Sequence, residues 1–337
     1  METQPQTVFV CVTVDTECDR DAYWGVRRPI RFRGVYEGIT ETLQPVFDDF
    51  GVRPTYLLSP EVIRDPRSVQ SLRNLGDRVE LGTHLHGEFI EPEAQMDAEV
   101  TLQMQSSLPL TGEKEKIENL TGLFEKTFGY RPLSFRAGRF GLSRHTLSIL
   151  EELGYRVDTS VVPLHGEADP GGSVSFLSAP FKAYFPSSDD FCRPGGLSVL
   201  ELPVTAGMSI WSEIPSALRP CVMKSRILRS LLCRMVGRRR CVPVWLRPTR
   251  RSAEEMMNLS TWWVERNPKE RAVILVMMFH NIEAVPGCSP YVHTEEDARE
   301  FIGSLRTYLG RALERNWRFA TLSEAASYHR ERGAVDR

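Results

Sequence analysis

The chain has 337 residues, of which 41% are apolar and 26% charged, as is typical of a soluble globular protein with one large or two ordinary domains. Its net charge of -2 gives no overall basis for binding nucleic acid. No run of about 18 apolar residues occurs, and the polar residues 1–7 lead directly into an apolar run, so we expect neither a membrane-spanning helix nor a signal peptide. The seven cysteines include no Cys-x-x-Cys pair, and Cys11 and Cys233 lie in apolar runs as small buried residues would, which favours a cytoplasmic location.

Strand and helix signals alternate along the whole chain. The first expected strand, residues 8–14, is a nearly continuous β-branched run, as in a parallel strand buried on both faces. A helical pattern at residues 39–50 follows and ends at Gly51. Seven or eight such units favour a closed, irregular barrel over a doubly wound open sheet, which would give the same signals. The later strands are expected at 55–58, 79–84, 133–136, 155–158, 199–204, 273–279 and 318–322.

Residues 219–251 break this alternation. They contain eleven basic residues and no acidic one, and Ile227, Leu228 and Leu231 are interleaved among the basic residues. We expect a helical insertion at 205–260 within a single barrel domain at 8–328, followed by a tail at 329–337. The insertion could contact an anionic membrane surface, or it could be a solvated helix that packs on the barrel through its leucines.

Chemically active side chains stand at the ends of several expected strands. Asp15 and Glu17 end the first strand, His84 and His86 the third, and His280 the seventh. Side chains two apart on a strand share a face, and the carboxyl ends of parallel strands meet at one edge. We therefore expect one active site at the top of an α/β barrel.

Two imidazoles on one side of a strand end can bind a divalent metal, although they could also be a hydrogen-bonded pair at a strand edge. Glu88 is a possible further ligand or an outer partner of such a site. Arg136 could fix a carboxylate base through two hydrogen bonds, or it could form a surface salt bridge. Asp158 could orient an arginine or a histidine, or it could cap a helix or turn.

Three further histidines have less definite roles. His280 could act as a general acid, since its ordinary pKa is near neutrality, or be a satisfied core histidine. His165 and His293 lie in expected loops, where histidines are usually solvated, although both could reach a substrate.

Taken in order, these segments resemble the polysaccharide deacetylase family, carbohydrate esterase family 4. The resemblance runs from about Val8 to about Ala325 outside the basic insertion, and it implies a distorted (β/α) barrel of the glycoside hydrolase/deacetylase type. It also implies roles for the matching residues: Asp15 as catalytic base, His84 as metal ligand, Arg136 as the arginine that positions the base, Asp158 as the fourth-motif residue and His280 as general acid. The matching segments are Thr13–Glu17, His84, Phe135–Phe140, Asp158, Phe279–His280 and Phe319–Glu324.

Two positions depart from the family pattern. Thr16 stands where the family has a metal-binding aspartate, and Glu88 stands where it has a second histidine. We infer that Glu17 and His86 replace these ligands, as in a His-x-His branch of the family.

The resemblance implies a hydrolase with a divalent metal, expected to be Zn²⁺, that removes an acetyl group from an N-acetylated sugar or glycan intermediate. The expected partner is thus a glycan and not nucleic acid. One alternative is a non-catalytic glycan-binding or assembly protein on the same barrel, because two usual ligands are missing. The other is a glycosidase that pairs Asp15 or Glu17 with Asp158. The sequence does not indicate an oligomeric state.

Overall fold

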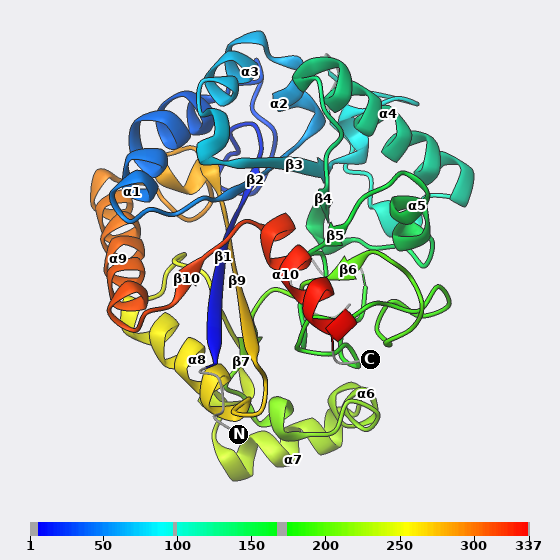
Figure 1. The fold of residues 1–337 in the computed structure, drawn as a ribbon, viewed down its shortest axis with the longest axis vertical. Coiled ribbons are helices and arrows are strands. Elements are labelled where there is room, and N and C mark those ends of the chain that lie inside the picture. Colours follow the sequence, from blue (N-terminus) through cyan, green and yellow to red (C-terminus); the bar gives the residue numbers. More distant parts are fainter. Residues whose placement is uncertain (1–5, 97–99, 167–173, 336–337) are drawn as a thin grey trace.

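The computed structural model describes residues 6–96, 100–166 and 174–335, and its strands and helices alternate as expected (Figure 1). Residues 336 and 337 of the expected tail lie outside the described residues. The strands are β1 (Thr7–Thr16), β2 (Thr55–Leu58), β3 (Glu80–Leu85), β4 (Ser134–Ala137), β5 (Val157–Asp158), β6 (Leu200–Glu201), β7 (Ala206–Gly207), β8 (Val244–Trp245), β9 (Ala272–His280) and β10 (Arg318–Phe319). The α-helices are α1 (Gln44–Asp49), α2 (Pro60–Arg64), α3 (Pro66–Arg73), α4 (Leu110–Phe128), α5 (Thr146–Glu152), α6 (Arg219–Lys224), α7 (Arg226–Val236), α8 (Ala253–Arg266), α9 (Glu295–Glu314) and α10 (Leu322–Val335).

Eight of these strands form one curled parallel sheet around β1. One edge of β1 pairs with β9 over its whole length, and the other edge pairs first with β10 and then with β2. From β2 the sheet continues through β3, β4 and β5 to β6. Just beyond β6, Thr205 closes the circuit, because its backbone N–H donates to the carbonyl of Val276 on β9 (3.0 Å) and its hydroxyl accepts from the Val276 N–H (2.8 Å). The predicted irregular barrel is confirmed, and the open-sheet alternative is wrong.

The alternation of side chains along β1 separates two cores. Val8, Val10, Val12 and Val14 face the surrounding helices, whereas Phe9 and Cys11 face the inside of the barrel. The inner core also contains apolar residues of α10, and the ring of Tyr328 on α10 packs on the ring of Phe9 at 4.7 Å. The helix α10 therefore covers the amino-terminal end of the barrel, and the opposite end is left for the strand-end side chains.

The basic insertion leaves the barrel between β7 and β8, which pair antiparallel with each other. Helices α6 and α7 lie together at one end of the molecule, at the bottom of Figure 1. The side chains of Ile227, Leu228 and Leu231 are 80%, 45% and 53% exposed, so these residues do not pack on the barrel. Cys233 is another correction, because it is only partly buried and forms a disulfide with Cys241. Among the described residues, no helix is both long and apolar enough to cross a membrane.

Candidate metal and catalytic site

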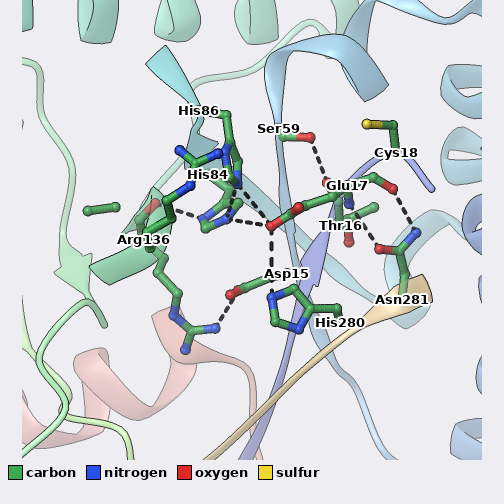
Figure 2. A network of polar contacts seen from close by, with 12 residues as sticks. Asp15, Thr16, Glu17, Cys18, Ser59, His84, His86, Arg136, His280 and Asn281 are labelled. Carbon is green, nitrogen blue, oxygen red and sulfur yellow. Dashed lines mark hydrogen bonds and ion pairs between the residues drawn. The ribbon is translucent and has the colours of Figure 1, made fainter. Parts of the chain in front are cut away.

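Asp15, Glu17, His84, His86 and His280 line one pocket of about 330 Å³. They converge because β1, β3 and β9 run parallel and end at the same edge of the barrel. The strand register aligns Asp15 with His280, and it also places His84 beside Arg136 of β4. Figure 2 shows these side chains turned toward one another.

Three donor atoms form a compact triangle at the centre of this pocket. The carboxylate Oε1 of Glu17 lies 3.2 Å from Nε2 of His84 and 2.9 Å from Nε2 of His86, and the two Nε2 atoms are 3.1 Å apart. A tetrahedral ion with ordinary zinc–ligand bond lengths separates its donor atoms by about 3.3 Å. Two imidazoles and a carboxylate at this spacing therefore fit a divalent metal.

The other ring nitrogens hold both imidazoles in this orientation. Nδ1 of His84 lies 3.0 Å from the backbone carbonyl oxygen of Arg136, to which it donates. Nδ1 of His86 faces the buried carboxylate of Glu88 at 3.4 Å, and Glu88 is in turn paired with Arg139. Each histidine thus presents Nε2 to the triangle, in the carboxylate- or carbonyl-supported arrangement that is usual for metal-binding histidines.

Charge pairing favours the ionised form of Glu17. Burial alone would raise the pKa of this carboxyl, but the charges of His86 and Arg20 hold it well below its usual range. The guanidinium of Arg20 donates through Nε and Nη2 to Oε2 of Glu17 (3.1 and 2.8 Å), which leaves Oε1 for the triangle. Burial opposes protonation of His86, but Glu17 outweighs it and raises the pKa of His86 to about 9. A metal and a proton therefore compete for this imidazole.

Asp15 lies beside the triangle and is fixed from behind. Nη1 of Arg136 donates to Oδ1 of Asp15 at 2.5 Å, while Nη2 donates to the hydroxyl of Thr13 (2.8 Å) and Nε to the carbonyl of Thr159 (2.9 Å). Burial would raise the pKa of Asp15, but Arg136, His84 and His280 hold it below its usual value. The side chain is therefore an oriented carboxylate, as a proton acceptor requires.

His280 lies next to Asp15, at the end of the neighbouring strand β9. Its Nδ1 donates to Oε1 of Glu283 at 3.0 Å, and its Nε2 lies 3.8 Å from Oε1 of Glu17. The Trp24 ring packs against the imidazole with a centroid distance of 4.9 Å. The glutamate holds the ring of His280 so that Nε2 faces the pocket.

Asp158 is placed differently from the other site residues. It is completely buried and does not line the pocket, and its carboxylate accepts from the backbone N–H and the hydroxyl of Ser160. Its carboxyl group interacts with that of Glu201, where burial and the charge of Asp158 raise the pKa of Glu201 well above its usual value. No hydrogen bond joins Asp158 to Arg136 or to His280 within the described ranges. It can influence Arg136 only through its charge or through the neighbouring Thr159.

Thr16 and Glu88, the two residues that depart from the family pattern, both lie outside the triangle of donor atoms. Thr16 is buried and donates its hydroxyl to the carbonyl of Val14 (3.1 Å), away from the triangle. Glu88 stands behind His86 as an outer partner. Of the two loop histidines, His165 lines the pocket, whereas His293 lines a separate surface cleft.

Three important residues were not predicted: Arg20, Glu283 and Asn281. Asn281 joins two strand ends, because its side chain accepts from the backbone N–H of Glu17 (2.9 Å) and donates to the Glu17 carbonyl (3.1 Å) (Figure 2). Arg20 and Glu283 each lie three residues after the side chain that they orient, which is a spacing that could have identified them.

No protein-family model matches this chain, and no curated protein matches it in sequence. Several solved structures share its fold. A protein assigned as a polysaccharide deacetylase from Mycobacterium smegmatis matches with a TM-score of 0.55 and 16% identity over 98% of this chain and 92% of its own. A protein assigned as a glycoside hydrolase/deacetylase from Parabacteroides distasonis matches with a TM-score of 0.59 and 14% identity over 96% and 71%.

A 4-alpha-glucanotransferase from Thermococcus litoralis also matches, with a TM-score of 0.53 and 13% identity over 96% of this chain and 40% of its own. The resemblance to polysaccharide deacetylases is thus confirmed at the level of the fold. Since these proteins differ in activity, the reaction has to be argued from the site itself.

Proposed function

We propose that this protein is a metal-dependent amide hydrolase that removes the acetyl group from an N-acetylated sugar or glycan intermediate. The observation that carries the proposal is the triangle of Glu17, His84 and His86 beside an arginine-fixed aspartate and a glutamate-fixed histidine. A deacetylase needs these parts together, since water must be activated on one side of the amide and the leaving nitrogen protonated on the other.

The triangle fits a divalent ion, and its two-imidazole, one-carboxylate composition favours Zn²⁺. When bound, the ion would polarise the acyl carbonyl and lower the pKa of a water molecule. Glu88 and the Arg136 carbonyl keep the two imidazoles in place for this role.

The protein side chains account for the proton transfers. Asp15 accepts a proton from the water whose oxygen attacks the acetamide carbon. The C–N bond then breaks, and Nε2 of His280 gives its proton to the departing nitrogen, so that acetate and a free amine leave. Arg136 keeps Asp15 oriented and ionised, and Glu283 keeps His280 oriented. Asp158 acts as a positioning residue behind Arg136.

The walls of the pocket support a carbohydrate substrate. Trp24, Phe140, Trp245 and Tyr291 line it beside the polar cluster. Aromatic walls with a few convergent polar groups are typical of sites for small ligands, and a flat ring face can lie against the apolar face of a sugar. The glycosidase alternative loses support, because its second carboxylate, Asp158, does not reach the pocket.

The test combines metal analysis with acetate release from N-acetylated oligosaccharides. We expect the wild-type protein to contain about one divalent ion and to release acetate, and His84→Ala to lose both. His145→Ala, at a partly buried histidine that does not line the pocket, serves as a matched control and should retain both. Full activity and metal content in His84→Ala would contradict the proposal, and glycan binding without acetate release by metal-loaded wild type would favour the non-catalytic alternative.

The insertion also supports contact with an anionic membrane surface, because Ile227, Leu231 and Met235 are exposed on a helix that carries several arginines. Sedimentation with anionic and neutral vesicles tests this contact.

The cytoplasmic location remains a prediction from sequence. The disulfide between Cys233 and Cys241 is of a kind more common in oxidising compartments.

A further inference from the structure

A second, larger cavity adjoins the catalytic pocket. Its volume is about 1090 Å³, and its wall is formed by α7 and by the segment 237–243 that follows it. His165 and Trp245 line both this cavity and the catalytic pocket, so the two spaces meet at these side chains. The rings of these two residues pack edge to face at 5.3 Å and form the boundary between the two spaces.

The charge of this cavity is one-sided. Among the described residues, four arginines and no aspartate or glutamate line it; the arginines are Arg226, Arg229, Arg234 and Arg238. None of the four forms an ion pair within the described part of the chain, whereas exposed arginines elsewhere do, such as Arg33 with Glu37 and Arg266 with Glu213. We call this cavity the arginine groove. Four like charges without a counterion repel one another, and an anion would relieve the repulsion.

One face of α7 and the disulfide at its end place the lining residues of the groove. Its lining residues on this helix follow the i, i+3, i+4 spacing of one face, while the exposed apolar side chains occupy another. The disulfide from Cys233 to Cys241 ties α7 to the short helical segment Arg238–Cys241. The arginines on both sides of this link therefore face the same cavity.

We propose that the arginine groove binds the phosphate group or groups of a substrate in which the N-acetylated sugar is linked to a phosphate or diphosphate. The guanidinium fork matches phosphate oxygens through paired, charge-assisted hydrogen bonds. The sugar would pass His165 and Trp245 to place its acetamide at the Glu17–His84–His86 triangle. This assignment rests on the proposed deacetylase function and narrows its substrate to glycosyl phosphates.

Two carriers share this chemistry, a nucleotide and a lipid. The test compares kcat/KM for three probes: UDP-N-acetylglucosamine, a short-chain polyprenyl-diphosphate N-acetylglucosamine in detergent, and uncharged N,N'-diacetylchitobiose. The variant is Arg226→Gln with Arg229→Gln and Arg234→Gln. The control removes the same charge from the exposed Arg311, Arg315 and Arg318. Melting temperatures verify that both triple variants are folded.

We expect one of the two diphosphate probes to be preferred, and the preferred one identifies the carrier. The groove variant should lose about 10- to 100-fold in kcat/KM for that probe and change less than about twofold for diacetylchitobiose, since charge-assisted hydrogen bonds to phosphate are lost. The control variant should resemble wild type. No preference for either diphosphate probe over diacetylchitobiose, or equal losses on all probes, would overturn the proposal.

Calorimetric binding of inorganic diphosphate separates this proposal from the deacetylase function, because it requires no turnover. Binding by wild type that is weakened at least tenfold in the groove variant, and retained in the control variant, would support the groove even if no probe were deacetylated. Absence of binding, or equal binding by both triple variants, would overturn it even if diacetylchitobiose were deacetylated.

Discussion

The catalytic pocket and the arginine groove differ in whether their charged side chains have partners within the protein. In the pocket the two carboxylates and the histidine each have a partner: Glu17 has Arg20, Asp15 has Arg136, and His280 has Glu283. In the groove the arginines stand on an exposed helix without acidic neighbours among the described residues. Buried charges require such pairing, whereas exposed charges are solvated by water and can remain unpaired until a ligand binds. The pocket is thus preorganised, and the groove is completed by what binds there.

The largest expected effect comes from removing the charge of Asp15 while keeping its shape. Asp15→Asn should lower kcat by about 10²–10⁴-fold, which is the usual contribution of a general base, while metal content stays at the wild-type level. Acetate-release kinetics and elemental analysis check both parts. Asp77→Asn, at an exposed carboxylate, is the control. Unchanged turnover in Asp15→Asn would remove the aspartate from the mechanism.

A loss that is nearly as large is expected on the other side of the substrate. His280→Ala should lower kcat by about 10²–10³-fold without loss of metal, because the leaving nitrogen would lack its proton donor. Glu283→Gln should cost only about tenfold, since it disturbs the orientation of His280 and not the proton itself, and it should alter the pH profile of kcat. Loss of metal from the Glu283→Gln variant would contradict this, because it would show that Glu283 supports the metal site and does not act on His280 alone.

A smaller effect is expected from the outer partner of His86. Glu88→Gln should weaken metal affinity by about 10- to 100-fold, as other outer-partner substitutions do, and activity should recover when metal is supplied in excess. Metal titration against a competing chelator measures the affinity. Wild-type affinity in this variant would mean that Glu88 merely neutralises Arg139.

The smallest effect concerns stability and pH at the pair formed by Asp158 and Glu201. Because the folded-state pKa of Glu201 is raised, its contribution to stability is complete below the unfolded pKa of about 4.3 and is lost as pH rises toward the folded pKa. The Glu201→Gln side chain cannot ionise. As pH rises over that range, the free energy of unfolding of this variant should therefore increase relative to that of the wild type, by up to about 1.4 kcal/mol per pH unit. Denaturant unfolding at several pH values tests this, and parallel pH dependences would contradict it.

The strand-end chemistry could be predicted from the sequence because it follows from alternation and parallel register alone. Asp15 and Glu17, and likewise His84 and His86, share a face as their spacing requires. The surroundings of Asp158 could not be predicted, because its partner Glu201 lies 43 residues away on the next strand. The exposure of Leu231 could not be decided from the sequence, since an apolar stripe on a helix can pack against a core or meet a membrane surface. Only the three-dimensional arrangement shows that α7 leaves that stripe uncovered.

Anomalous diffraction from crystals of the wild-type protein grown with zinc tests whether Glu17, His84 and His86 bind a metal. We expect one strong peak within about 2.0–2.2 Å of Oε1 of Glu17 and of Nε2 of both His84 and His86. Crystals in which the three side chains keep this arrangement but hold no metal, while the protein in solution still releases acetate, would contradict it.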